Sequence, residues 1–169
     1  MFQCFYPSEY VSSTYSIDFD AFYQKGYRAV IFDIDNTLVP HGAPADERSR
    51  ALIAHLKELG MQVFLLSNNK EERVKRFVDD QELPYIHKAG KPLVRNYRKA
   101  MERMGTTKEN TFFVGDQLFT DVWGAKRSGI YHILVQPIHP TEEIQIVLKR
   151  KLEKVVLKEY AKKSEKKQS

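Results

Sequence analysis

The sequence predicts an α/β domain with a mainly parallel sheet, and three observations support this fold class. Nearly continuous apolar runs, rich in β-branched and aromatic residues, recur along the chain and are typical of strands buried on both faces. Segments with the apolar spacing of amphipathic helices lie between these runs. Several of those segments end at a glycine, as helices often do.

Five apolar runs are expected to form strands. The first, RAVIFDI at residues 28–34, is almost entirely apolar until its aspartate, which fits a strand buried on both faces. A run near 85–87 is short and gives the weakest pattern. The remaining three are MQVFLLS, TFFVGD and YHILV, at residues 61–67, 111–116 and 131–135.

Four helices are expected to connect these strands. In residues 45–59, Leu52, Leu56 and Leu59 fall on one face before Gly60 ends the pattern. The other helices are expected at residues 70–80, 92–104 and 120–128. Strands and helices that alternate in this way form parallel sheets, whose ligands bind at the carboxyl ends of the strands.

Length and composition favour a single domain in the cytoplasm. A chain of 169 residues with 42% hydrophobic residues can bury one sizeable core. The single cysteine, Cys4, cannot form a disulfide within the chain, which favours a reducing compartment. No apolar run approaches the ~20 residues of a membrane-spanning helix, and the N-terminus lacks the pattern of a secretory signal. We therefore expect a cytoplasmic protein.

The positive charge is concentrated at the C-terminal end of the chain. The whole sequence has a formal net charge of +5, and residues 149–169 contribute nine Lys or Arg against three Glu, a local charge of +6. The first 148 residues therefore sum to −1. This distribution argues against a nucleic-acid groove across the folded body.

Polar residues follow three of the expected strands at the points where those strands end. Asp33 and Asp35 end the first strand, SNN (67–69) ends the next, and GDQLFTD (115–121) follows a third. Lys91 stands at the expected start of a helix. Because the carboxyl ends of parallel strands share one edge of the sheet, we expect these groups to line one crevice.

The chemistry of these groups points to phosphoryl transfer with a metal ion. Two neighbouring carboxylates repel each other unless a cation lies between them, and Asp116 from another strand completes a set of hard oxygen ligands suited to Mg²⁺. One carboxylate can attack phosphorus, while a second protonates the leaving group and then activates water. A serine hydroxyl, backbone N–H groups and a lysine could neutralise the phosphoryl oxygens.

Four short motifs carry a family resemblance. DIDNT, LLSNN, KAGKP and GDQLFTD, in this order, resemble the motifs of the haloacid dehalogenase (HAD) superfamily of aspartate-dependent phosphotransferases, over roughly residues 27–138. With the opening YPSEYVSSTYSID, the chain more closely resembles the YqeG group of subfamily IIIA phosphatases, related to phosphatidylglycerophosphate phosphatases. The resemblance implies a three-layer Rossmann-like domain, with too few residues between the motifs for a large cap domain.

The resemblance also implies roles for individual residues. Asp33 matches the nucleophile and a metal ligand, and Asp35 matches the general acid/base, which also binds metal through its backbone carbonyl. Asp116 matches the acidic metal ligand. Asp121 matches a second acidic position, with capping of the following helix as the alternative. The matched catalytic and substrate-binding set, in addition to Asp33 and Asp35, is Thr37, Ser67, Asn68 and Lys91.

Simpler interpretations of some of these residues stay open. Ser67 and Asn68 could cap the following helix, a role compatible with anion binding. Lys88 is a rival to Lys91, which is favoured because Pro92 follows it at the expected helix start. The five histidines show no ligand spacing, so a zinc site is not expected.

The last part of the chain is expected to form a basic helix and a disordered tail. We place the catalytic domain, with its aromatic N-terminal segment, at residues 1–140 and the basic helix and tail at 141–169. Thr141 is the expected N-cap, before an apolar stripe of Ile144, Leu148, Leu152, Val155 and Val156. This stripe could pack on the domain, or the helix could lie on an anionic membrane.

The sequence thus predicts a Mg²⁺-dependent phosphomonoester phosphatase that acts through an aspartyl-phosphate. By resemblance, phosphatidylglycerophosphate is the leading substrate. The alternative is a non-catalytic adaptor with the same fold, docking through its basic tail on RNA, a ribosome or a membrane. An adaptor has no need for both Asp33 and Asp35, which favours the enzyme.

Overall fold

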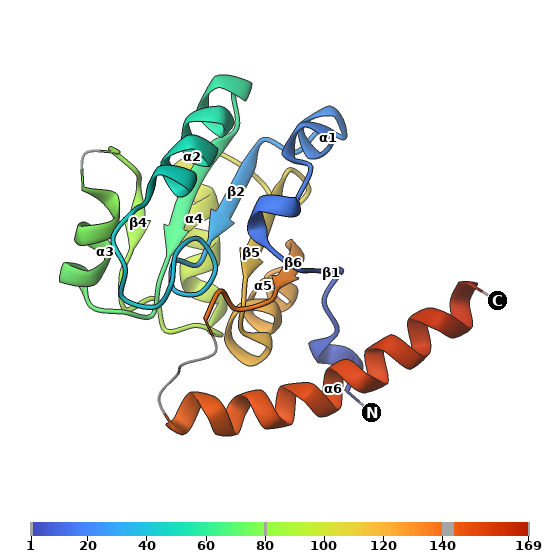
Figure 1. Cartoon of the computed structure of the whole chain (residues 1–169). Helices are drawn as coiled ribbons and strands as arrows, with labels where there is room; N and C mark the ends of the chain where they lie inside the picture. Colours follow the sequence, from blue (N-terminus) through green and yellow to red (C-terminus); the bar gives the residue numbers. More distant parts are fainter. Residues whose placement is uncertain (1, 80, 140–143, 169) are drawn as a thin grey trace.

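The computed structural model describes residues 2–79, 81–139 and 144–168, except for the side chains of 144–148 and 165–168. In these residues the strands form one parallel sheet with the order β1-β6-β5-β2-β3-β4 (Figure 1). The strands are β1 (Glu9–Val11), β2 (Ala29–Phe32), β3 (Gln62–Leu66), β4 (Tyr85–Ile86), β5 (Thr111–Gly115) and β6 (Tyr131–Val135). The fold is therefore the α/β, Rossmann-like class that the sequence predicts.

The strand order reverses at β2, which places the candidate residues at a topological switch point. The chain runs from β2 to β3 and β4 on one side, and then crosses to β5 and β6 on the other. In register, Val30 of β2 pairs with Val63 of β3 and with Phe112 of β5. Ligands of open α/β sheets bind just beyond the strand ends at such a point.

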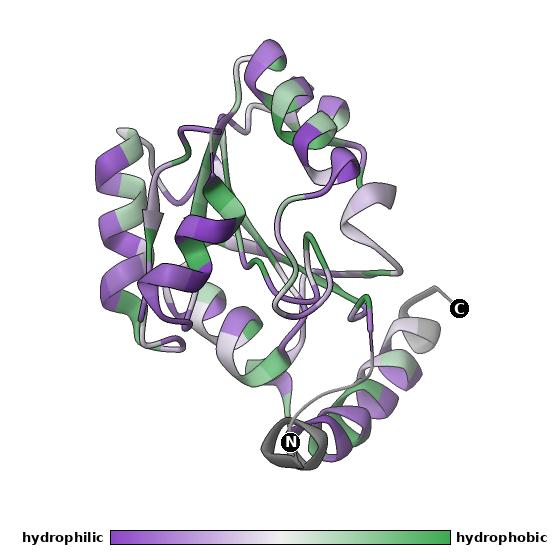
Figure 2. Ribbon diagram, turned by 60° about the vertical axis from the view of Figure 1, so that its left-hand side comes forward, coloured by the Kyte–Doolittle hydropathy of each residue, from purple (hydrophilic) through white to green (hydrophobic). Residues whose placement is uncertain are grey.

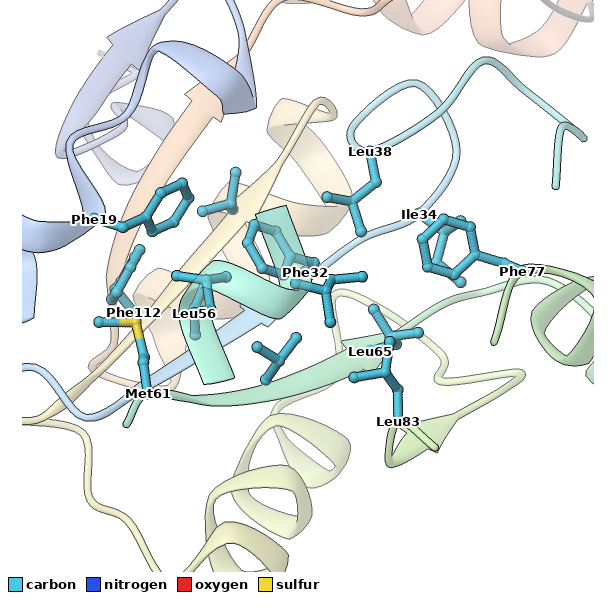
Figure 3. Close-up of a cluster of buried hydrophobic side chains, with 14 of the residues drawn as sticks. Phe19, Phe32, Ile34, Leu38, Leu56, Met61, Leu65, Phe77, Leu83 and Phe112 are labelled. Atoms are coloured by element: carbon cyan, nitrogen blue, oxygen red, sulfur yellow. The ribbon is translucent and has the colours of Figure 1, made fainter. Parts of the chain in front are cut away.

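Helices cover both faces of the sheet and make the three layers. Successive residues of β2 alternate between two cores: Val30 and Phe32 face one, and Ala29 and Ile31 face the other. Figure 3 shows the first core, where residues of α1, α2 and α3 meet the sheet. The second core lies under α4 and α5. The helices are α1 (Phe19–Gln24), α2 (Glu47–Leu59), α3 (Glu71–Val78), α4 (Val94–Met104), α5 (Trp123–Arg127) and α6 (Ile144–Gln168).

The four expected connecting helices are present, with shifted ends. At the start of α2, Asp46 and Ser49 form a reciprocal capping box, and Gly60 ends this helix with a φ of 85°. The expected helix at 120–128 differs most, because its first part is a π-helical turn (Leu118–Val122) that leads into α5. The sequence did not predict α1 or β1.

The connections that frame the candidate site are short. Between Asp35 and Ser67 the chain forms α2 and β3, and between Ser67 and Lys91 it forms α3 and β4. No cap domain is inserted in either described connection, as the motif spacing predicts. Figure 2 shows the strands mainly green, whereas the helices mix purple and green residues, so the apolar residues concentrate in the sheet. Among the described residues, none of the helices combines the length and the apolar character needed to cross a bilayer.

The C-terminal segment differs from its sequence-based description in two respects. Helix α6 continues to Gln168, so the expected disordered tail is helical here. Leu152 and Val155 of the expected apolar stripe are 58% and 55% exposed, whereas Val156 is buried against Leu118 and Val122. The predicted cap Thr141 lies outside the described residues, and so do the side chains of Ile144 and Leu148. The domain boundary at residue 140 stays a prediction.

Candidate active site

The predicted site residues converge at the carboxyl edge of β2, β3 and β5. Five of them, Asp33, Asp35, Ser67, Asn68 and Lys91, line a cavity of about 260 Å³, and Asp116 and Asp121 lie next to Asp33. Asp33 and Asp35 reach it from the loop after β2, and Ser67 from the end of β3. Lys91 enters from the connection between β4 and α4. Gln117 and Thr120 add a fourth segment, which follows β5, so segments that are distant in the sequence contribute to one cavity.

Lys91 lies between two carboxylates. Its ammonium Nζ is 2.6 Å from Asp33 Oδ1 and 2.6 Å from Asp121 Oδ1, and all three side chains are buried. The backbone of Lys91 is fixed by Asn68, whose Oδ1 accepts its N–H at 2.8 Å and whose Nδ2 donates to its carbonyl at 3.2 Å. Lys88 instead donates its backbone N–H to the carbonyl of Asn69. The structure therefore brings Lys91 onto Asp33, and Asn68 holds the lysine in addition to lining the cavity.

Three buried carboxylates form a group that could hold a metal ion. Asp33, Asp116 and Asp121 each offer one oxygen, and these oxygens lie within 4.8 Å of one another. Oxygen ligands with this charge suit a hard divalent cation such as Mg²⁺. The carboxylate of Asp35 is not part of this group, and the predicted metal contact of its backbone carbonyl stays a prediction. Asp121 does not cap α5, since its second oxygen accepts the N–H of Gln117 at 3.0 Å.

The electrostatics of this group favour an added positive charge. Burial raises the pKa of Asp33 to about 7, although Lys91 acts in the opposite direction and Asp121 adds to the rise. Burial, with repulsion from Asp33 and Asp121, also raises the pKa of Asp116 well above its usual range. Burial alone would lower the pKa of Lys91, but Asp121 and Asp33 raise it overall, so this lysine is charged. A divalent cation would offset the remaining negative charge, so the donor set fits such an ion.

Asp35 has a separate set of partners that the sequence did not indicate. Arg73 of α3 donates from Nε and NH2 to Asp35 Oδ1 at 3.1 and 2.9 Å. Asn69 Nδ2 donates to the other oxygen at 2.6 Å, and the backbone N–H of Gly42 donates to Oδ1 at 2.7 Å. Arg73 lies on the buried face of an amphipathic helix, beside Val74 and Phe77. The sequence signal for this contact was a charged residue, Arg73, at a position that the helical pattern assigns to the apolar face.

Thr37 and Ser67 also lie at the site. The hydroxyl of Thr37 donates to Asp116 Oδ1 at 3.3 Å, so this side chain supports the carboxylate group. Its predicted contact with substrate stays a prediction. Ser67 lines the cavity, and its Oγ accepts the N–H of Asn69 at 3.1 Å. Neither Ser67 nor Asn68 caps α3, whose N-cap is Lys70.

Helix α6 also contacts the site, which the sequence did not indicate. Arg150 donates to the carboxylate and to the backbone carbonyl of Asp116. It also pairs with Glu153 at 3.1 Å, and Glu153 accepts the N–H of Leu118 at 2.9 Å. The basic segment therefore joins the loop after β5, close to the three carboxylates.

The fold and the site together define a phosphatase of the haloacid dehalogenase type. A family model described as haloacid dehalogenase-like hydrolase matches residues 41–129, which include Ser67, Lys91, Asp116 and Asp121. The chain belongs to this family. It is 35% identical over 154 residues to "Probable phosphatase YqeG" of Bacillus subtilis (strain 168), covering 90% of each chain.

A more distant relative and one solved structure extend these similarities. The chain is 28% identical over 161 residues to "Phosphatidylglycerophosphate phosphatase 1, chloroplastic/mitochondrial" of Arabidopsis thaliana. That match covers 87% of this chain and 45% of the plant protein. The cobalt-bound deoxy-D-mannose-octulosonate 8-phosphate phosphatase of Haemophilus influenzae superimposes with a TM-score of 0.52 and 17% identity, covering 67% of this chain and 80% of that one. This last similarity concerns the fold.

Proposed function

We propose that this phosphatase hydrolyses phosphomonoesters with Mg²⁺, through an aspartyl-phosphate on Asp33. The observation that supports this mechanism is the pairing of two differently held carboxylates in one cavity. Asp33 is bound to Lys91, whereas Asp35 is bound to Arg73 and Asn69. In this mechanism Asp33, beside the ammonium of Lys91, is the nucleophile, and Asp35, held apart from that lysine, transfers the proton.

The first step forms a bond between an oxygen of Asp33 and phosphorus and breaks the bond from phosphorus to the substrate oxygen. Asp35 gives its proton to that leaving oxygen. Lys91 neutralises the phosphoryl oxygens, with the Ser67 hydroxyl as a further donor. In the second step Asp35 takes a proton from water, whose oxygen attacks phosphorus. The bond to Asp33 breaks, which restores its carboxylate and releases inorganic phosphate.

Asp33, Asp116 and Asp121 would hold the Mg²⁺ ion. When bound, the ion would neutralise charge on the phosphoryl group and on the nucleophile. Thr37 and Arg150 both bind Asp116, and Lys91 and Gln117 bind Asp121, so each ligand has a fixed orientation before substrate arrives. Hydrogen bonds from other residues to the ligating carboxylates typically contribute to metal affinity.

For the substrate, we propose a phosphomonoester of the phosphatidylglycerophosphate kind, within subfamily IIIA. The support is the name of the plant relative and the absence of an inserted cap in the described connections around the cavity. A site without a cap domain suits a phosphate presented on a large molecule or at a surface. Peripheral contact of a cytoplasmic enzyme with a membrane, through the basic helix α6, would fit such a substrate.

Release of inorganic phosphate tests the proposal. The wild-type chain should hydrolyse an aryl phosphate with added Mg²⁺ and lose that activity in chelator. Asp33→Asn should lose nearly all turnover and keep its melting temperature within a few degrees, because an amide is not a nucleophile. Turnover of Asp33→Asn within a few-fold of wild type would remove Asp33 from this role. An inactive wild type that still binds vesicles or RNA would favour the adaptor.

A further inference from the structure

Helix α6 contributes a lysine to the active-site cavity. Lys149 lines the same cavity as Asp33, Ser67 and Lys91, although it lies 58 residues beyond Lys91 in the sequence. It is one of the nine basic residues of the C-terminal segment, which by sequence alone form a uniform group. The structure separates it from the others, since Lys151 and Lys154 are exposed away from the cavity lining.

The neighbouring residues of α6 fix the position of Lys149. Arg150, the next residue, is anchored to the carboxylate and the carbonyl of Asp116. Glu153 lies one turn further and accepts the N–H of Leu118 at 2.9 Å, while it also pairs with Arg150. Val156 follows, buried at 2% exposure in the apolar cluster with Leu118. These contacts run along one face of the helix, so the backbone of Lys149 is held at the cavity.

The other basic side chains at the cavity already have carboxylate partners. Lys91 binds Asp33 and Asp121, and the Nδ1 of His41 lies 3.9 Å from Asp35 Oδ1. Within the described part of the chain, no carboxylate lies within 4.0 Å of the ammonium of Lys149, which is exposed. Among the described residues Lys149 thus has no carboxylate partner, and its ammonium can meet an anion that enters the cavity.

The cavity is small compared with a drug-sized ligand site. Its volume of about 260 Å³ is below the range of roughly 300–1,000 Å³ that such sites span. It can enclose a phosphoryl group and the atoms next to it, while the rest of a larger substrate lies at the mouth. A lysine that stays available after Lys91 has met the scissile phosphate can bind a second anionic group there.

We propose that Lys149 is a specificity-determining residue that binds a second anionic group of the substrate. The preferred substrate class is then a phosphomonoester that carries another phosphate, as a diester or a second monoester, a few bonds away. This inference rests on the proposed phosphatase function and adds the substrate feature that α6 recognises. Arg150 acts as a positioning residue, because it holds α6 where Lys149 can reach the cavity.

The test compares soluble substrates, so that membrane binding plays no part. Glycerol 3-phosphate has one phosphate, glycerol 1,3-bisphosphate has a second monoester, and deacylated phosphatidylglycerophosphate has a diester. The wild type should show a lower KM for at least one doubly charged compound than for glycerol 3-phosphate. Lys149→Gln should reduce that preference roughly tenfold, the effect of losing one charge-assisted hydrogen bond. Which compound loses most identifies a diester or a monoester as the second group.

Two variants separate recognition from a structural effect. Lys149→Arg should keep most of the preference, because the charge remains. Lys158→Gln, at an exposed position further along the same helix, should keep the wild-type ratio of the two KM values. Added salt should weaken the preference in the wild type and have little effect on it in Lys149→Gln. An unchanged preference in Lys149→Gln would overturn the inference.

Binding measurements keep this result distinct from failure of the proposed function. In an Asp33→Asn background, calorimetry with glycerol 1,3-bisphosphate should show weaker binding after Lys149→Gln and unchanged binding after Lys158→Gln. If the wild type releases no phosphate but this difference is present, the phosphatase mechanism fails and the anion site stands. If phosphate is released and neither binding nor KM depends on Lys149, only the anion site fails.

Discussion

Arg73 binds one oxygen of Asp35 with two nitrogens, Nε at 3.1 Å and NH2 at 2.9 Å. Asn69 binds the other oxygen at 2.6 Å, so both oxygens of the carboxylate are held. These two partners come from the segment that follows β3, whereas Asp35 follows β2. The orientation of the proposed acid/base thus depends on a neighbouring strand and helix, which fixes the direction in which a proton is transferred.

Arg73→Gln should therefore lower kcat far more than it changes KM. Loss of the guanidinium frees one side of Asp35, and we expect kcat to fall roughly 10²-fold, the scale of a misplaced acid/base. Arg73→Lys should keep a higher kcat than Arg73→Gln, because one charged donor remains. Steady-state kinetics with an aryl phosphate measures both constants.

A matched control lies on the same helix. Arg76 of α3 is exposed, so Arg76→Gln should leave kcat close to wild type. Thermal melting checks that the variants stay folded, since removal of one partner of a buried ion pair is often destabilising by about 3–5 kcal/mol. Equal kcat in Arg73→Gln and Arg76→Gln would contradict a positioning role for Arg73.

Gly115 is the residue at the end of β5 where a side chain would disturb Asp121. A Cβ built there would lie 2.5 Å from Asp121 Oδ2 and 2.6 Å from its Cγ, so something must move. Because Asp121 Oδ1 binds Lys91, the displacement should reach the nucleophile. Gly115→Ala should lose roughly 1–3 kcal/mol of unfolding free energy, as overpacked cores do, and most of its activity. Denaturant unfolding and phosphate release measure the two losses, and wild-type values for both would show that Asp121 can be displaced without consequence.

The order of the elements was predictable from the sequence, because buried strands and amphipathic helices leave separate periodic patterns. The site was predictable to the extent that its residues follow strand ends, which parallel topology brings together. Asp33, Asp35, Ser67 and Asp116 meet this condition, whereas Lys91 lies in the connection between β4 and α4.

The contacts that were missed have no local pattern. Strand β1 has three residues and gains its place by pairing with β6, far along the chain. Arg73 is one of several charged residues in KEERVKRF, and its burial depends on the packing of α3. Arg150 reaches Asp116 because α6 lies against the loop after β5. The composition of the helix does not indicate this packing.

His132 should make the stability of the fold depend on pH. Burial lowers the pKa of His132, with the charge of Lys126 acting in the same direction and the carbonyls of Ile130 and Tyr6 opposing. The neutral ring is thus favoured in the folded state. The contribution of the neutral ring to the free energy of unfolding is complete above the ordinary histidine pKa of about 6.5. It is lost as the pH falls through the lower pKa that His132 has in the folded state.

His132→Gln should remove that part of the pH dependence. The melting-temperature difference between wild type and variant should shrink as the pH is lowered from about 7.5 to about 5.5, because the variant has no ring to protonate. Comparing the two proteins cancels the effect on the melting temperature of the carboxylates that also titrate in this range. A difference that stays constant over this range would show that His132 titrates alike in the folded and unfolded chains.

The outer face of α6 carries four exposed lysines with helical spacing, Lys151, Lys154, Lys158 and Lys162. Leu152 and Val155 are exposed beside them. Basic residues next to exposed apolar ones are typical of helices that lie on anionic lipid. This face is separate from Lys149 and Arg150, which point to the active site. The structure therefore allows a test of membrane contact that leaves the cavity intact.

Changing these four lysines to glutamine should weaken binding to anionic vesicles. Each contributes on the order of 1 kcal/mol near such a surface, so the combined loss of affinity should be roughly a thousandfold at low salt and smaller at high salt. Co-sedimentation with neutral and anionic vesicles measures binding. The matched control replaces four exposed lysines from other elements, Lys25, Lys57, Lys99 and Lys108, which removes the same charge from the chain. If α6 docks on lipid, only the first variant loses binding, and it also loses turnover of a phosphate presented on vesicles while it hydrolyses a soluble aryl phosphate at the wild-type rate. An equal loss in both variants would mean that net charge, and not this face of α6, determines the attraction.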